Sequence, residues 1–321
     1  RATVGRDRLE REVREAWPVE RASAITGVAA VDIEALAARL ARDRRVAIRL
    51  NYGLQRHAGG GAAVRAIVAL ASVLGAWRHA GCGALLSTSG AFPKDRQRLA
   101  RPDLMPAPTP RTVNMSRLGE ALDPKVTSDP PVEALFVYAS NPAAVAPDQN
   151  AVLRGLVRED LFTVVHELFV TDTARYADVL LPATTQLEQW DIHTSYGHYY
   201  VTANRPSIAP LGEAVSNAEL FRRLARRMGF TDPCFEDDDR ALMDQAFRWD
   251  DPRMDGITVE RLLEVGPLRL NLPRPFVPFA DPERPIDLAP EELPLYVPPV
   301  EIGAADAAPE RHPLALVSPP A

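Results

Sequence analysis

Polar side chains follow apolar segments in the second half of the chain, at the points where those segments end. Ser140-Asn141 follows "EALFVYA", His166-Glu167 closes "LFTVVHE", and Thr171 begins "TDTARY". A carboxylate at the end of a buried strand can accept two hydrogen bonds from a ribose diol or from a guanine edge. A structural reading is equally open, with Asn141 in a turn, Glu167 in solvent and Thr171 as a helix cap.

A glycine-rich loop forms the second candidate, "YGLQRHAGGG", with Tyr52, Gly53, Arg56 and His57 before the glycine run. Glycines let a backbone approach a ligand, and a following helix directs its first N–H groups at an anion. Arg56 could bind a phosphate or a carbonyl-rich ring through two donors. The order is neither GxGxxG nor a P-loop, so a tight turn with a solvated arginine is the alternative reading.

The third candidate is the loop after "ADVLLP", where Pro182 ends an apolar strand and acids, amides, histidines and tyrosines follow as far as Tyr200. Gln189 lies in this loop, and Asn217 heads the next helix. Ligands of α/β proteins bind beyond the carboxyl ends of parallel strands. We therefore expect the loop to contact a ligand.

Metal and hydrolase sites have little support. His193 and His198, with Asp191 nearby, have weak spacing for metal ligands. Cys82 and Cys234 are isolated and form no CxxC pattern. No GxSxG motif is present. The sequence therefore assigns no metal ligand and no catalytic residue within this chain.

The elements that must position these residues alternate between helix and strand. In the first part, an amphipathic helix over 31–42 with Leu36 on its apolar face precedes a strand over 44–53. The glycine-rich loop then leads into a helix reaching Trp77, whose small and apolar residues predict burial on most sides. This order is half of a doubly wound domain.

A βαβαβ pattern returns in the second part. Three short apolar strands are expected within 133–142, 161–169 and 177–182, with a helix over 148–160 after the first. Apolar residues on both faces are typical of a buried parallel sheet. The predicted fold class is α/β, with two doubly wound (Rossmann-like) parallel-sheet lobes. Proline-rich segments over 91–131 and 251–313 read as linkers.

The segment 217–230 has the clearest helical pattern, and Gly229 ends it. Its four arginines are expected to face solvent. The residues expected to face inward are Leu220, Phe221, Leu224, Ala225 and Met228.

Composition narrows the class of protein. The chain has 321 residues, of which 46% are apolar and 25% charged, as in a soluble globular protein. Its net charge of −6 argues against a nucleic-acid surface, and no apolar run is long enough for a membrane span. Because the chain starts at Arg1 and not at Met, we expect a piece of a longer protein.

The segments "FVYASNPAAVAPDQN", "FTVVHELFVTDTARYADVLLPATTQLEQ" and "PLGEAVSNAELFRRLARRMGF" together resemble the molybdopterin oxidoreductase family of the dimethyl sulfoxide reductase type. The glycine-rich loop and its helix fit the same family. The resemblance implies an interior fragment of a catalytic subunit. Residues 1–90 would end one pterin-dinucleotide domain, 91–300 would form most of a second, and 301–321 would lead to a missing C-terminal domain.

The resemblance also implies roles for residues. Tyr52 and Arg56 match a loop that touches the pterin, and His166-Glu167 matches the strand end that holds guanosine, where the family usually has Asp. The whole implied cofactor-binding set is Tyr52, Gly53, Arg56, His57, Ser140, Asn141, His166, Glu167, Thr171, Gln189 and Asn217.

The implied cofactor is molybdenum bis(molybdopterin guanine dinucleotide), with a 4Fe-4S cluster in the absent N-terminal region. The implied activity is two-electron redox or oxygen-atom transfer in anaerobic respiration, with a small-molecule substrate and an electron-transfer subunit or redox partner. We expect a cytoplasmic protein, with a periplasmic location open because the region of an export signal is absent. Leu85 to Ser87 stand near the place where formate dehydrogenases carry a catalytic arginine, which argues against formate oxidation.

A non-catalytic function is the competing hypothesis. The large iron–sulfur subunit of respiratory NADH dehydrogenase resembles this fold but binds no molybdenum, and it serves as an electron-carrying scaffold. The polar residues Arg56, Asn141, Glu167 and Gln189 are all retained here, which favours the enzyme.

Overall fold

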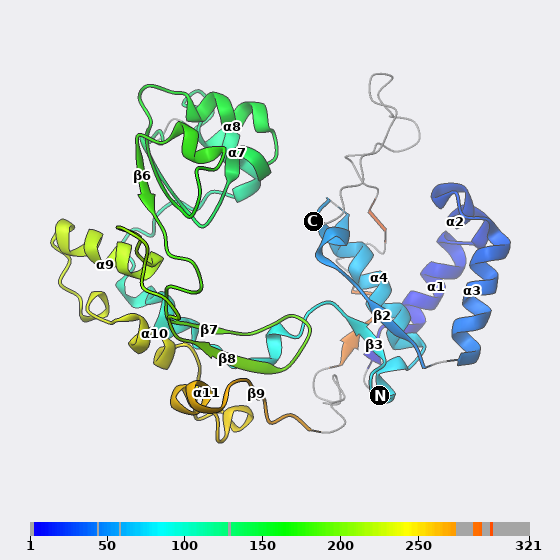
Figure 1. Ribbon diagram of the computed structural model, residues 1–321. Coiled ribbons are helices and arrows are strands. Elements are labelled where there is room, and N and C mark those ends of the chain that lie inside the picture. The colour runs from blue at the N-terminus through cyan, green and yellow to red at the C-terminus, as the bar shows by residue number, and fades with distance from the viewer. Residues whose placement is uncertain are drawn as a thin grey trace. The chain divides into compact units, whose positions relative to one another are not determined.

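The computed structural model describes residues 3–43, 45–57, 59–127, 130–273, 285–290 and 296–297 (Figure 1). The chain divides into two compact units. Unit 1 comprises Arg1–Thr88 with Leu272–Ala321, and unit 2 comprises Ser89–Asn271. The predicted linker over 301–321 lies outside the described residues.

The described residues of unit 1 contain two pairs of parallel strands, β1 with β10 and β2 with β3. Its α-helices and strands are β1 (Thr3–Val4), α1 (Arg6–Ala16), α2 (Val19–Thr26), α3 (Ala30–Asp43), β2 (Ala47–Arg49), α4 (Gly60–Val73), β3 (Gly83–Leu85) and β10 (Ile286–Asp287). A short 3-10 helix, η1 (Tyr52–Gln55), follows β2.

The helices of unit 1 are less buried than their sequences predict. The helix predicted over 31–42 is confirmed as α3, but no residue of it is buried, and Leu36 on its apolar face is 57% exposed. On α4, Ala69 and Ala71 are buried, but Leu70 and Val73 are exposed. The reason is an apolar cavity of about 550 Å³, which these two residues line together with Val13 of α1.

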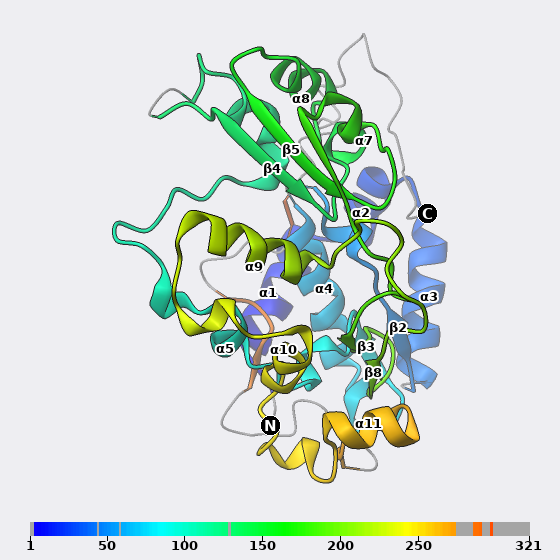
Figure 2. The same cartoon turned by 60° about the vertical axis from the view of Figure 1, so that its left-hand side comes forward.

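Unit 2 is built on a parallel sheet of order β4-β5-β6 (Figure 2). Its α-helices and strands are α5 (Arg96–Ala100), α6 (Leu118–Ala121), β4 (Ala134–Tyr138), α7 (Pro142–Val145), α8 (Gln149–Leu156), β5 (Phe162–Glu167), β6 (Val179–Pro182), β7 (Asp191–His193), β8 (Tyr200–Asn204), α9 (Asn217–Met228), α10 (Asp239–Gln245), α11 (Val259–Val265) and β9 (Leu268–Arg269). The parallel strands and helices confirm the predicted α/β class.

Helices cover both faces of the β4-β5-β6 sheet. Leu135 packs against the buried cluster formed by α6, α7 and α8, which includes Leu122 and Val152. Side chains alternate between the faces of a strand, so Phe136 and Tyr138 point the other way. Their rings contact Phe221 of α9, with centroids 5.6 and 5.0 Å apart.

One prediction about unit 2 is wrong, and one of its sheets was not predicted. The proline-rich segments are not plain linkers, because 91–131 contains α5 and α6, and 251–270 contains α11 and β9. An antiparallel sheet, β7-β8-β9, was not predicted, because its strands are only two to five residues long.

None of the helices in the described part of the chain is both long and apolar enough to cross a membrane.

The core of unit 2 gives a stability prediction. Val152 of α8 is 0% exposed, whereas Val157, at the end of the same helix, is 61% exposed. Val152→Ala removes two buried methyl groups and leaves a cavity, so it should lower the free energy of unfolding by about 1.5–3 kcal/mol. Val157→Ala should change it by less than about 0.5 kcal/mol. Denaturant unfolding of both variants checks this, and equal losses would contradict the described core.

Candidate functional site

A cavity of about 420 Å³ lies at the carboxyl edge of the β4-β5-β6 sheet. Six of the residues predicted from the sequence line it: Ser140, Asn141, His166, Glu167, Gln189 and Asn217. The strand register explains their meeting, because Tyr138 pairs with His166 and Glu167 pairs with Pro182. The ends of all three strands therefore reach the same edge.

His166 is the buried centre of this edge, with 0% of its surface exposed. Its Nε2 lies 3.1 Å from the carbonyl oxygen of Pro182, which ends β6. Its Nδ1 lies 2.9 Å from the side-chain amide of Asn217, the first residue of α9. One ring thus joins β5, β6 and the start of α9.

Asn141 has its side chain engaged within the protein. Its Oδ1 accepts hydrogen bonds from the backbone N–H of Thr173 at 3.0 Å and from the Thr173 hydroxyl at 2.7 Å. The Thr171 hydroxyl accepts from the Ala174 N–H at 3.3 Å and is not among the residues that line the cavity. Asn141 and Thr171 therefore make the turn and helix-capping contacts that the sequence left open as the structural alternative to ligand binding.

Glu167 is half-buried and faces the same cavity. Its Oε1 accepts from the Leu168 N–H at 2.7 Å, and within the described residues no other hydrogen bond to this carboxylate is formed. A carboxylate has several acceptor positions on its two oxygens. Glu167 therefore keeps acceptor capacity for a ligand.

Glu188, which sequence reasoning passed over, organises the loop beyond β6. Its carboxylate accepts from the Thr185 N–H, from the Thr185 hydroxyl and from the Leu211 N–H, at 2.8, 2.9 and 2.7 Å. The backbone hydrogen bonds from Thr185 and Leu211 and the hydroxyl of Thr185 lower the pKa of Glu188. The adjacent Gln189 is held by the Thr184 hydroxyl, 2.8 Å from its Oε1. Glu188 therefore joins the start of this polar loop to Leu211, and Asn204 holds the same loop by donating to the carbonyl oxygens of Gln186 and Gln189.

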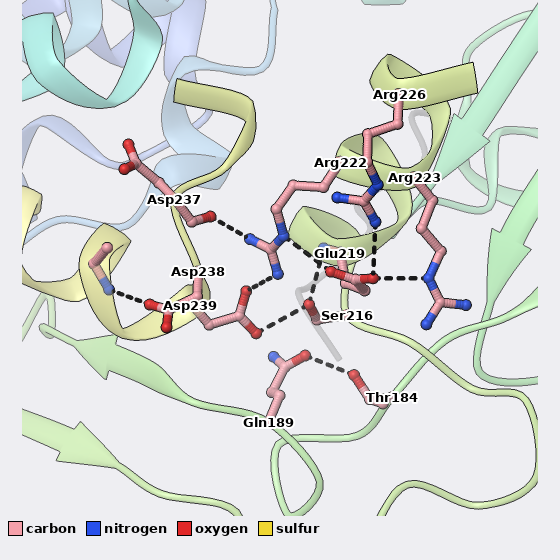
Figure 3. Close-up of polar contacts among 11 residues, drawn as sticks. Thr184, Gln189, Ser216, Glu219, Arg222, Arg223, Arg226, Asp237, Asp238 and Asp239 are labelled. Atoms are coloured by element: carbon pink, nitrogen blue, oxygen red, sulfur yellow. Dashed lines mark hydrogen bonds and ion pairs between the residues drawn. The ribbon is translucent and has the colours of Figure 1, made fainter. Parts of the chain in front are cut away.

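A charge network fixes the start of α9 (Figure 3). Arg222 donates to Glu219 at 2.9 Å and to Asp239 of α10 at 2.7 Å. Asp239 also accepts from the hydroxyl of Ser216, which caps α9. Burial acts to raise the pKa of Glu219, but hydrogen bonds from Arg223 and Arg222 outweigh it and hold that pKa below its ordinary value. The network anchors the turn that carries Asn217.

Arg222 and Met228 correct the predicted faces of α9. Only 11% of the Arg222 side chain is exposed, because its two carboxylate partners make burial of the cation tolerable. Leu224 and Met228 were both predicted to face inward, but both are exposed. The C-terminal turn of α9 around Met228 is exposed as well. Ala225 is buried as predicted.

A second cavity of about 320 Å³ adjoins the first. Gln189 and Asn217 line both, and Lys94, Trp190 and Asp239 lie on the second alone. The second cavity is otherwise lined largely by apolar side chains, such as Leu242, Met243 and Phe247. The shared residues place the two cavities side by side within unit 2, and together they are called the cleft.

The remaining predicted residues lie in unit 1, on η1 and the turn before α4. A Cβ on Gly60 would lie 2.3 Å from the Cα of Gln55, so a close backbone approach requires glycine there. Arg56 is exposed, and its guanidinium forms no hydrogen bond or ion pair with the part of the chain that the structure describes. The Nδ1 of His57 is buried and has no hydrogen-bond partner among the described residues. A buried polar atom without a partner is suited to a ligand contact.

Comparison with known proteins now decides the family. A profile of the molybdopterin oxidoreductase family matches residues 21–227. The chain belongs to the molybdopterin oxidoreductase family. It is 42% identical over 294 residues to the probable oxidoreductase YoaE of Bacillus subtilis, covering 91% of this chain and 43% of that protein. It is 32% identical over 236 residues to the dimethyl sulfoxide/trimethylamine N-oxide reductase of Rhodobacter capsulatus, covering 65% of this chain and 28% of that protein.

Among solved structures, acetylene hydratase from Pelobacter acetylenicus has a TM-score of 0.66 at 21% identity, over 89% of this chain and 44% of that one. This likeness shows the fold. The chain spans less than half the length of these relatives.

Glu188 gives a prediction about pH. Because its pKa in the folded state is lowered from the ordinary 4.5, its stabilising effect is present above that pH and is lost as the pH falls through the folded-state pKa. Because the glutamine amide carries no charge, the Glu188→Gln variant lacks this stabilising effect. The difference in unfolding free energy between wild type and variant should therefore be largest at neutral pH and should shrink below pH 4.5. Thermal unfolding across pH checks this, with Glu213→Gln at an exposed position as control; a constant difference would contradict it.

The charge network gives a second prediction. Arg222→Ala leaves two carboxylates without their partner, so it should lower the free energy of unfolding by about 1.5–3 kcal/mol. Arg223 also bonds Glu219 but is 57% exposed, so Arg223→Ala should cost less than about 1 kcal/mol. Denaturant unfolding of the two variants measures the contrast. Similar small losses would mean that the network does not anchor α9.

Proposed function

We propose that this chain holds the guanine dinucleotide form of molybdopterin within a molybdenum-dependent oxidoreductase. The observation that carries the proposal is the convergence of six predicted residues on one polar cavity at a sheet edge. Family membership and the relatives named as oxidoreductases and oxide reductases support it. When bound, the cofactor would supply two-electron redox chemistry, and the chain would bind and orient it.

The residues of the cleft fit such a group. Glu167 and Asn217 offer polar atoms to a base or a ribose, and Gln189 continues the lining into the adjoining cavity. Lys94 there supplies a cation for a phosphate. We infer that an extended dinucleotide spans the two adjoining cavities.

In unit 1, the Nδ1 of His57, which has no hydrogen-bond partner among the described residues, and the exposed guanidinium of Arg56 fit contacts to a pterin. Tyr52 and Gly53 belong to the same turn. We infer that each unit is a doubly wound domain serving one dinucleotide, as a bis form of the cofactor requires. An iron–sulfur cluster, a small-molecule substrate and a redox partner belong to the same proposal for the whole protein.

The non-catalytic scaffold is not favoured, because the matched relatives are named as enzymes and the polar residues of the cavity are retained. The substrate is left unassigned, since the likeness to acetylene hydratase extends to the fold alone.

Glu167 provides the test. A hydrogen bond to a charged acceptor is worth roughly 1.5–3 kcal/mol, so Glu167→Ala in the complete protein should weaken retention of the dinucleotide about ten- to a hundredfold. Glu167→Gln should be intermediate, because it keeps one acceptor and loses the charge. The measurements are molybdenum per chain, GMP released by acid hydrolysis, and the thermal midpoint without cofactor.

Glu159→Ala, the same change at an exposed position away from the cavity, should retain wild-type loading. If Glu167→Ala retained the wild-type content of molybdenum and GMP, Glu167 would have no role in holding the dinucleotide. A large fall in its cofactor-free midpoint would instead make Glu167 a structural residue.

A further inference from the structure

The ring of His166 lies between two groups that restrict where its protons can be. The carbonyl oxygen of Pro182, 3.1 Å from Nε2, can only accept a hydrogen bond. Nε2 must therefore carry a hydrogen. The same carbonyl also accepts from the Val215 N–H at 3.2 Å, which uses its second lone pair.

The contact at Nδ1 then has two solutions. With Asn217 Oδ1 facing the ring at 2.9 Å, Nδ1 must also carry a hydrogen, and the imidazole is a cation. With the amide turned over, Nδ2–H donates to an unprotonated Nδ1, and the imidazole is neutral. The oxygen and nitrogen of an asparagine amide are assigned from such networks, so chemistry must choose.

Burial favours the neutral ring. His166 is 0% exposed, and its hydrogen-bond partners are a carbonyl and an amide, neither of them charged. The adjacent carboxylate, Glu167, accepts from the Leu168 N–H. A buried cation without a counter-charge is strongly disfavoured, and the neutral tautomer satisfies both ring nitrogens.

We propose that His166 is a positioning residue that turns the Asn217 amide, so that Nδ2 donates to the ring and Oδ1 faces the cavity. Within the described residues, the outward amide atom of Asn217 has no protein partner. Together with the Glu167 carboxylate, it makes this end of the cavity a pair of acceptors. The cavity therefore selects a ligand group that donates hydrogen bonds.

This selection rests on the proposed nucleotide site. Two parts of a guanosine carry suitable donors, namely the N1–H and N2–H₂ edge of the base and the ribose hydroxyls. An adenine edge offers an acceptor at N1 and fits less well.

The tautomer is tested first, in ligand-free complete protein labelled with ¹⁵N-histidine. Long-range proton–nitrogen correlation should show His166 with an unprotonated Nδ1 and a protonated Nε2. The signal is identified by its absence in His166→Gln or, if that variant does not fold, by its change in Asn217→Asp. The carboxylate introduced by Asn217→Asp cannot donate, so Nδ1 of His166 should become protonated in that variant. Two protonated nitrogens in the wild type would overturn the proposal.

Ligand selection is tested with GMP, IMP and 2′-deoxy-GMP, by calorimetry on wild type, Asn217→Asp and Asn217→Leu, each checked for an unchanged thermal midpoint. Losing one hydrogen bond costs about 3- to 10-fold in affinity. Wild type should therefore discriminate by that factor against IMP if Oδ1 meets the N2 amino group, or against 2′-deoxy-GMP if it meets the 2′-hydroxyl.

The two variants separate an acceptor from a donor at position 217. Asn217→Asp keeps an oxygen and should keep the discrimination, since comparing ligands within one variant cancels repulsion of the phosphate. Asn217→Leu should lose the discrimination between GMP and its analogues. If both variants lost this discrimination, Asn217 would act as a donor to the ligand, and the proposal would be overturned. If GMP binds to none of the proteins, the proposed function fails, and the nitrogen spectra still decide the amide orientation.

Discussion

The hydrogen bonds of one buried imidazole hold the candidate site together. His166 stands on β5, contacts the last residue of β6 through Nε2 and contacts the first residue of α9 through Nδ1. Parallel register brings the strand ends to one edge, but it does not place a helix there. Because Asn217 lines both cavities of the cleft, the position of α9 relative to β5 decides the shape of the site.

Most polar side chains around the cleft are engaged with the protein itself. Asn141 closes the turn before β6, Glu188 closes the loop after it, and Arg222 joins α9 to α10. Such contacts order loops that carry little apolar surface, and a preorganised site loses less entropy when a ligand binds. Glu167 and Asn217 retain acceptor capacity toward the cavity, and the chemistry of recognition falls to them.

The sequence predicted what depends on short-range pattern. Apolar strands ending in polar residues located β4, β5 and β6, and parallel pairing then predicted that Asn141 and Glu167 would share an edge, as they do. Interactions between residues far apart in the chain could not be predicted from the sequence. Arg222 looks like a solvent-facing arginine until Asp239 of another helix is placed beside it, and Glu188 looks like any loop acid until the Leu211 N–H reaches it. Helical spacing likewise located the amphipathic helix α3, but it did not show that the described residues leave the apolar face of this helix uncovered.

The central claim is that the carboxyl edge of β4, β5 and β6 receives the nucleotide end of the cofactor. The most direct measurement is a crystal structure of the complete protein, freed of its cofactor and grown with GMP. The account predicts electron density for GMP in the cavity lined by His166, Glu167 and Asn217, with a donor group of the nucleotide at the Asn217 amide oxygen. GMP bound elsewhere, with this cavity holding only water, would contradict it.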